Sequence, residues 1–262
     1  QYQIYRMPAC IAAAVAAVKV SRPVRINIER DVDMAMTGQR HPFKISYKVG
    51  FTSQGQFTAL DIRLWSNAGC SFDLSLAVLE RAMLHVDNTY RFPNVRVRGR
   101  LCKTHLPSNT GLLSESNIEK KIIFKIGALR GFGGPQGLFG CETVVEHVAA
   151  YLKVDPFVIR HMNMYKEGEV THFGQELERW NIPRLVDELL QSSDYIQRQK
   201  SVEEFNQSNK FRKRGITILP TKFGIAFTAK FLNQAAALVH VYKDGSVLVS
   251  HGGQIVIFEE KK

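Results

Sequence analysis

The residues with the clearest chemical potential form a glycine-rich stretch, RGFGGPQG, that begins at Arg130. Its first three glycines are Gly131, Gly133 and Gly134. Glycine lets the backbone approach a ligand closely and adopt positive φ angles, and the free N–H groups at a helix start beginning at Pro135 would form a concave donor site for oxygen anions. Phe132 then either packs beneath the loop or stacks on a planar ligand. The simpler alternative is that the stretch only makes a tight connection before a helix.

Two familiar nucleotide-binding motifs are excluded in this stretch. A P-loop needs Gly-Lys-Ser/Thr after the glycines, and none follows. The dinucleotide fingerprint needs a third glycine where Gln136 stands.

The four cysteines are scattered without the spacing of a zinc site or a disulfide framework, so we expect reduced thiols. They are Cys10, Cys70, Cys102 and Cys141.

The net charge of +11 raises the question of a polyanionic partner. The basic residues are spread along the chain, and the densest group, within residues 198–214, is interrupted by glutamates and is typical of a solvated helix end. Arg96, Arg98 and Arg100 alternate along a predicted strand and therefore share one of its faces. That face is either exposed or meets an acidic partner domain, and we favour these interpretations over nucleic-acid binding.

The glycine-rich stretch must be positioned by the helices and strands whose signals surround it. We expect helices at residues 8–20, 72–86, 137–153 and 155–165, and one long or two short helices at 182–208. We expect strands at residues 22–31, 95–103 and 214–227, a hairpin at 41–69, and a hairpin at 237–253 whose KDGS sequence is typical of a tight turn. The alanine-rich helix at 8–20 is expected to be buried. Asp155, followed by Pro156, is expected to cap the next helix.

These elements predict an α+β fold with mixed sheets and packed helices. The hydrophobic content of 45% supports a packed core. No apolar run reaches the roughly 20 residues of a membrane span, and residues 8–20 lack the flanks of a signal peptide.

Four longer strings in the sequence resemble the molybdenum-cofactor region of the xanthine dehydrogenase/aldehyde oxidase family. They are LERAMLHVDNTYRFPNVRVRGRLCKTHLPSNT, LRGFGGPQG, MNMYKEGEVTHFGQELE and ILPTKFGIAFTAKFLNQAAALVHVYKDGSVLVSHGG. The resemblance runs from about Arg22 to Gly253 and is interrupted at residues 111–127. It implies a partial two-domain molybdopterin-binding region. Its first domain covers residues 1–170, the start of its second covers 171–253, and residues 254–262 form a tail outside the family pattern.

The resemblance implies roles for particular residues. The backbone amide of Arg130 would hold an oxygen ligand of the molybdenum, next to cofactor-binding Gly131, Gly133 and Gly134. Phe132 and Phe227 would sandwich a flat heterocycle, and Thr228 would hydrogen-bond it. Arg81, in LERA, would stabilise negative charge on the substrate oxygen. This arginine is typical of the xanthine dehydrogenase members and is absent from the aldehyde oxidases.

The activity implied is oxidative hydroxylation of purines, from hypoxanthine and xanthine to urate, with a molybdenum–molybdopterin cofactor. The substrate implied is a purine, or alternatively another N-heterocycle or an aldehyde. For the full-length enzyme the resemblance also implies 2Fe-2S clusters, FAD, NAD, the remaining enzyme domains and a homodimer, in the cytoplasm or alternatively the peroxisome. The general-base glutamate falls beyond residue 262, so we expect no catalytic residue in this chain and no turnover by it alone. Gln3 stands where the family has a substrate-contacting glutamate. The alternative function is a non-catalytic basic module that binds nucleic acid or an acidic partner.

Residues 111–127 depart from the family pattern because joining Thr110 to Ala128 restores it without a gap. The run is either a surface insertion or retained intron sequence, and we favour the second hypothesis. The change of pattern after Gly253 suggests the same origin for the tail.

Overall fold

The computed structural model describes residues 7–29, 31–32, 40–70, 74–106, 131–224 and 237–251. The chain divides into two compact units, residues 1–223 and 224–262. The α+β class is confirmed, because packed helices accompany sheets with both antiparallel and parallel strand pairs. The family-domain boundaries at residues 170 and 253 stay predictions.

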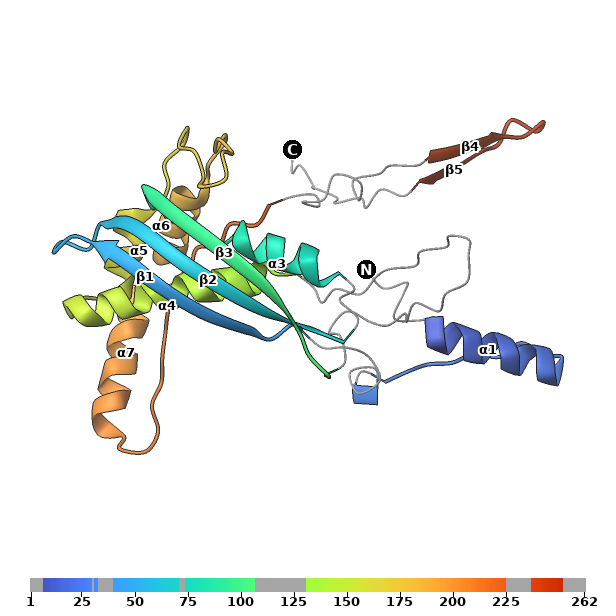
Figure 1. Ribbon diagram of the computed structural model, residues 1–262, viewed down its shortest axis with the longest axis horizontal. Coiled ribbons are helices and arrows are strands. Elements are labelled where there is room, and N and C mark those ends of the chain that lie inside the picture. Colours follow the sequence, from blue (N-terminus) through green and yellow to red (C-terminus); the bar gives the residue numbers. More distant parts are fainter. Residues whose placement is uncertain are drawn as a thin grey trace. The chain divides into compact units, whose positions relative to one another are not determined.

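A three-stranded sheet forms the centre of the first unit (Figure 1). β1 (Phe43–Phe51) and β2 (Phe57–Gly69) are antiparallel, which confirms the predicted hairpin, and Gly55 adopts a φ of 95° in the turn between them. β3 (Asn94–Lys103) runs parallel to β2. The order is therefore β1-β2-β3, with β2 in the centre.

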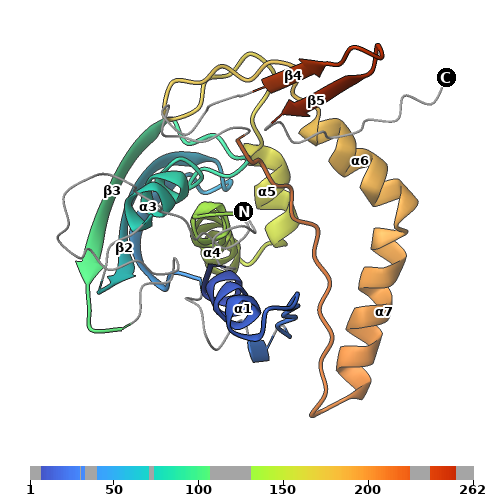
Figure 2. The same cartoon turned by 90° about the vertical axis from the view of Figure 1, so that its right-hand side faces the viewer.

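Two helices cover one face of this sheet (Figure 2). α3 (Ser75–Met83) lies between β2 and β3 in sequence, and α4 (Gly134–Leu152) follows the glycine-rich stretch. The core between sheet and helices is apolar and includes Leu60, Ile62, Leu64, Leu79, Val86, Val144, Val145 and Val148. Period-two burial along β2 and helical-period burial along α4 explain why these segments pack together.

Three shorter helices follow α4. α5 (Pro156–Asn163) begins at the predicted cap, where Asp155 Oδ1 accepts a hydrogen bond from the Phe157 amide at 2.7 Å. Residues 182–208 form two helices, α6 (Ile182–Ser192) and α7 (Tyr195–Ser208), separated by Asp194 in the left-handed conformation. The second unit contains the predicted hairpin of β4 (Ala237–Val241) and β5 (Val247–His251).

Three local expectations are wrong. The helix α1 (Met7–Val20) forms, but Ile11, Val15 and Val18 are exposed, because no described element covers them. Residues 23–29 and 215–224 form neither of the two expected strands, since neither segment pairs with a described neighbour.

No described helix is long and apolar enough to cross a membrane.

Candidate active site

The glycine-rich stretch lies against α3 through very close backbone contact. A Cβ atom on Gly133 would lie 1.8 Å from the carbonyl oxygen of Val78 and 2.8 Å from the amide nitrogen of Ala82. A Cβ on Gly137 would lie 2.4 Å from the Ala82 carbonyl oxygen. These glycines therefore let the start of α4 touch the same turns of α3 that carry Arg81.

The loop before α4 has an unusual backbone. Gly131 and Phe132 adopt φ angles of 85° and 56°, so two consecutive residues are left-handed. A non-glycine residue in this region costs about 1–3 kcal/mol, and the surroundings hold it there. The Gly134 amide donates to the Gly131 carbonyl at 2.9 Å, and Arg40 Nη1 donates to the Phe132 carbonyl at 3.1 Å.

Arg81 points into the protein from the last turn of α3. The residue is only 7% exposed, and its guanidinium lies 5.3 Å from the centre of the Phe223 ring. Burial lowers the pKa of Arg81, but a guanidinium remains charged in proteins. Arg81 is thus a buried cation next to the glycine-rich loop rather than a surface residue of an amphipathic helix.

His85 and Phe223 lie beside Arg81. His85 Nδ1 lies 2.7 Å from the Arg81 carbonyl oxygen and must donate to it, because a carbonyl only accepts. Burial lowers the pKa of His85. The rings of His85 and Phe223 lie 4.9 Å apart, and a Cβ on Gly134 would lie 2.4 Å from the Phe223 ring.

Phe223 is the site residue that sequence reasoning missed. It lies in the string PTKFGIAFT, four residues before the predicted Phe227. Its place in that string is the sequence feature that could have identified it as a site residue. Phe227, Thr228 and Arg130 lie outside the described residues. The structure therefore brings together Arg81 and the loop with Phe132, Gly131, Gly133 and Gly134, whose ligand roles stay predictions.

A buried polar clamp holds the segment that carries Phe223. Asn88 Nδ2 donates to the Pro220 carbonyl at 3.0 Å, and the Lys222 amide donates to Asn88 Oδ1 at 3.3 Å. Lys222 Nζ lies 2.7 Å from Asp87 Oδ2, which also accepts from the Tyr165 hydroxyl at 3.1 Å. Burial opposes ionisation of Asp87, but His172 and Lys222 outweigh it and lower the pKa of this carboxyl.

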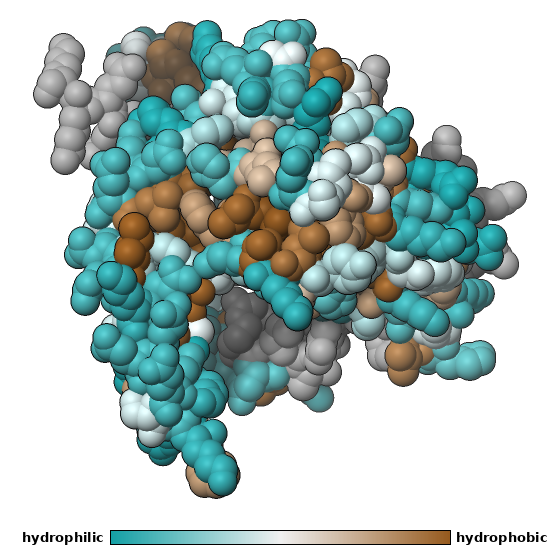
Figure 3. Space-filling model, turned by 90° about the vertical axis from the view of Figure 1, so that its left-hand side faces the viewer, coloured by the Kyte–Doolittle hydropathy of each residue, from teal (hydrophilic) through white to brown (hydrophobic). Residues whose placement is uncertain are grey.

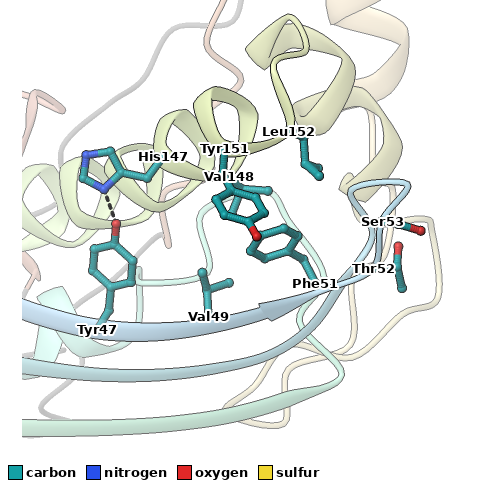
Figure 4. A pocket seen from close by; sticks show the side chains of 9 residues that line it. All are labelled: Tyr47, Val49, Phe51, Thr52, Ser53, His147, Val148, Tyr151 and Leu152. Carbon is teal, nitrogen blue, oxygen red and sulfur yellow. Dashed lines mark hydrogen bonds between the residues drawn. The ribbon is translucent and has the colours of Figure 1, made fainter.

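Two cavities lie along the junction of β1 and α4. One, of about 530 Å³, opens beside the glycine-rich loop and is lined by Arg40, Pro135 and Gln136 among others. The other, of about 650 Å³, lies at the C-terminal half of α4, where the Tyr47 hydroxyl hydrogen-bonds His147 Nδ1 (Figure 4). None of the predicted site residues lines this second cavity.

Comparisons with known proteins show the family to which this chain belongs. A family model described as molybdopterin cofactor-binding domain matches residues 3–112 and 122–164, and a second model with the same description matches residues 188–256. The chain is 52% identical over 240 residues to xanthine dehydrogenase of Emericella nidulans. The matched residues make up 92% of this chain and 16% of that protein. It is 50% identical over 242 residues to xanthine dehydrogenase/oxidase of Rattus norvegicus, with 92% and 17% covered.

Solved structures show the same fold at lower identity. The aldehyde oxidoreductase of Desulfovibrio gigas matches with a TM-score of 0.58 and 23% identity, over 90% of this chain and 24% of that one. The enzyme of Desulfovibrio desulfuricans matches with a TM-score of 0.60 and 22% identity, over 90% and 23%. The chain spans about one sixth of the length of the curated relatives that it matches.

Proposed function

Because the chain belongs to the molybdopterin cofactor-binding domain family, we propose that it forms part of a molybdenum hydroxylase that oxidises hypoxanthine and xanthine to urate. The observation that carries this proposal is the packing of the glycine-rich loop on α3, which places the buried cation of Arg81 beside the loop. About 50% identity to xanthine dehydrogenases supports the purine substrate. The activity is a property of the longer protein, and this chain alone is predicted to be inactive.

The residues near the loop fit a cofactor with hydrogen-bond donors. Gln136 Nε2 donates to the His41 carbonyl at 3.2 Å, whereas its buried Oε1 accepts no hydrogen bond from the described residues. A buried acceptor without a donor costs about 1–3 kcal/mol, so a ligand N–H group would be stabilised there. The adjacent cavity of about 530 Å³ also presents Arg40, which suits the negative phosphate of a pterin cofactor.

We assign the cofactor contacts to the loop and the substrate contacts to its surroundings. The amide of Arg130 and the turn of Gly131, Gly133 and Gly134 would hold the molybdopterin group, which supplies the redox chemistry of hydroxylation when bound. Phe132 and Phe227 would stack against the purine, with a hydrogen bond from Thr228.

Arg81 would stabilise the negative charge that develops on a purine oxygen during the reaction. A preorganised cation in a site removed from water contributes more to this stabilisation than an exposed one. The ring of Phe223, 5.3 Å from the guanidinium, orients the arginine from one side. The polar clamp of Asp87, Asn88 and Lys222 in turn fixes Phe223.

The longer protein would supply the rest of the reaction. We propose that other segments contribute the general-base glutamate, 2Fe-2S clusters and FAD, with NAD as electron acceptor, in a homodimer in the cytoplasm or the peroxisome. The exposed apolar residues of α4, α5 and α6 support packing against further domains; they include Tyr151, Val158, Met162, Leu185 and Leu189. A space-filling view shows apolar surface on one side of the molecule (Figure 3), and such patches are typical of interfaces.

A chimera tests the proposal. Residues 1–253, without 111–127, would replace the matching region of the rat xanthine dehydrogenase/oxidase. We expect this chimera to bind molybdopterin and to form urate from xanthine. Arg81→Met should lower kcat/KM for xanthine by about 10²–10³-fold, because one charge-stabilising donor is lost. Oxidation of a simple aromatic aldehyde, which has no purine oxygen for Arg81 to contact, should fall much less.

The controls separate the chemistry from folding. Arg198→Met, on the exposed surface of α7, should leave both activities unchanged. A chimera that holds molybdopterin but oxidises only aldehydes would contradict the purine assignment. Urate formation by the isolated 262-residue chain would contradict the prediction that it is inactive.

A further inference from the structure

The sheet of the first unit has a second face, opposite α3 and α4, that no described helix or strand of that unit covers (Figure 2). The register of the strands arranges its side chains in three cross-strand rows. The rows are Lys48–Asp61–Arg96, Ser46–Arg63–Arg98 and Lys44–Trp65–Arg100. Six of these nine residues are cationic and only Asp61 is anionic, so this face, which we call the basic face, carries a strong net positive charge.

Only part of this charge is neutralised within the described residues. Asp61 forms ion pairs with Arg96 and, at 3.2 Å, with Arg98. The hydrogen bond from Arg96, with a further one from Arg98, lowers the pKa of Asp61 to about 2, so it remains ionised at neutral pH. Arg63 and Arg100 have no hydrogen-bond or ion-pair partner among the described residues and are exposed.

The arrangement works against the stability of the isolated sheet. Arg63 lies directly beside Arg98 on the neighbouring strand, and like charges in such positions repel each other. An anionic surface placed over this face would remove the repulsion and gain charge-assisted hydrogen bonds to arginines that water now solvates.

We propose that the basic face docks a carboxylate-rich protein surface. Alternate residues of a strand lie about 6.6 Å apart and neighbouring strands about 4.8 Å apart. Arg96, Arg98 and Arg100 therefore match glutamates or aspartates at alternate positions of an extended acidic segment, which repeats at the same distance. The relatives are about six times longer than this chain, so the longer protein has ample further polypeptide to provide that surface.

A protein partner fits this face better than a nucleic acid. Proteins that bind single-stranded nucleic acids combine cations with several aromatic rings on which bases stack. Trp65 is the only aromatic residue in the three rows, and the Lys44 ammonium lies 5.8 Å from its ring centre. The face thus offers charge in a regular grid but little surface for stacking.

The test measures binding of the 262-residue chain to a fluorescent peptide of alternating glutamate and threonine. We expect binding at low salt that weakens steeply at high salt, since exposed ion pairs are screened. The double variant Arg63→Glu/Arg100→Glu should weaken binding about tenfold or more, because attraction becomes repulsion at two positions of the face. The matched control Arg198→Glu/Lys200→Glu makes the same change in net charge on exposed positions of α7 and should bind within about twofold of the parent.

Several outcomes would overturn the proposal. They are equal binding by the parent and Arg63→Glu/Arg100→Glu, an equal loss in the α7 control, and tighter binding of a single-stranded RNA than of the peptide at the same salt. Circular dichroism checks that the variants fold. Should charge reversal unfold the sheet, Arg63→Gln/Arg100→Gln removes the charges without adding new ones and should still weaken binding severalfold. Unchanged binding by that folded variant would also overturn the proposal.

Discussion

Gly133 is the single residue on which the geometry of the candidate site depends most directly. Its φ of −90° is available to any residue, so the need for glycine is purely steric. Because an added Cβ would lie 1.8 Å from the Val78 carbonyl oxygen, Gly133→Ala must push the loop away from α3. We expect the free energy of unfolding to fall by about 1–3 kcal/mol, as for overpacked cores.

Urea unfolding measures this change, and Gly215→Ala is the matched control. No atom lies within 4 Å of a Cβ at residue 215, so that variant should stay within about 0.5 kcal/mol of the parent. A Gly133→Ala protein as stable as the parent would show that the loop does not rest on α3 in solution.

His41 makes the stability of the fold depend on pH. Burial, aided by the nearby charge of Arg40, lowers the pKa of His41 to about 4, whereas an unfolded histidine has a pKa of about 6.5. Between these two pKa values His41 is protonated in the unfolded chain but not in the folded protein. The free energy of unfolding should therefore fall as the pH is lowered from about 6.5 to 4.

Urea midpoints between pH 7 and pH 4 test this dependence. His41→Gln should flatten it in part, because burial also lowers the pKa of His85 and that residue still contributes in the same direction. His161→Gln, at an exposed position of α5, should leave the slope as in the parent. A His41→Gln protein with the full slope would assign the effect to other groups.

At the scale of elements, the sequence predicted those features that depend only on residues close together in the chain. The alternation in residues 41–69, the cap at Asp155 and the KDGS turn each depend on neighbours within a few positions, and all three are confirmed. The expected burial of α1 and the expected strand at residues 22–31 depended instead on distant partners, which the described residues do not provide.

The candidate site shows the same limit more sharply. The sequence placed Arg81 on an amphipathic helix, but its periodicity does not say that the arginine faces inward over Phe223. The clamp that fixes Phe223 joins Asn88 to Pro220, which are 132 positions apart in the chain. Periodicity and motif spacing do not predict a contact between residues so far apart in the sequence. The resemblance identified Arg81 and the loop, whereas Phe223 and the clamp became visible only through packing.

At the scale of the whole molecule, the described surface has two regions that a partner would stabilise. One is the apolar surface of α4 to α6, and the other is the basic face of the sheet. The first surface would bind an apolar partner and the second an acidic one. Salt distinguishes the two contacts, because a hydrophobic contact is insensitive to moderate salt whereas a charged contact is screened by it. Both fit a chain that spans about one sixth of its relatives.

The 24 residues between Leu106 and Gly131 allow a last prediction about the whole chain. The family match is interrupted within them, between residues 112 and 122, inside the run 111–127 that departs from the family pattern. Deleting that run leaves a connection of seven residues. Closing a shorter loop costs less entropy, so the free energy of unfolding should rise by about 1 kcal/mol if the run makes no native contacts.

Urea unfolding of the deletion variant measures this difference, and a variant with 17 glycine and serine residues in place of the run is the length-matched control. We expect the control to be about as stable as the parent, because it closes a loop of the same length. A deletion variant that loses stability while the control also loses it would mean that residues 111–127 pack in the native structure. They would then be part of the fold and not an interruption of it.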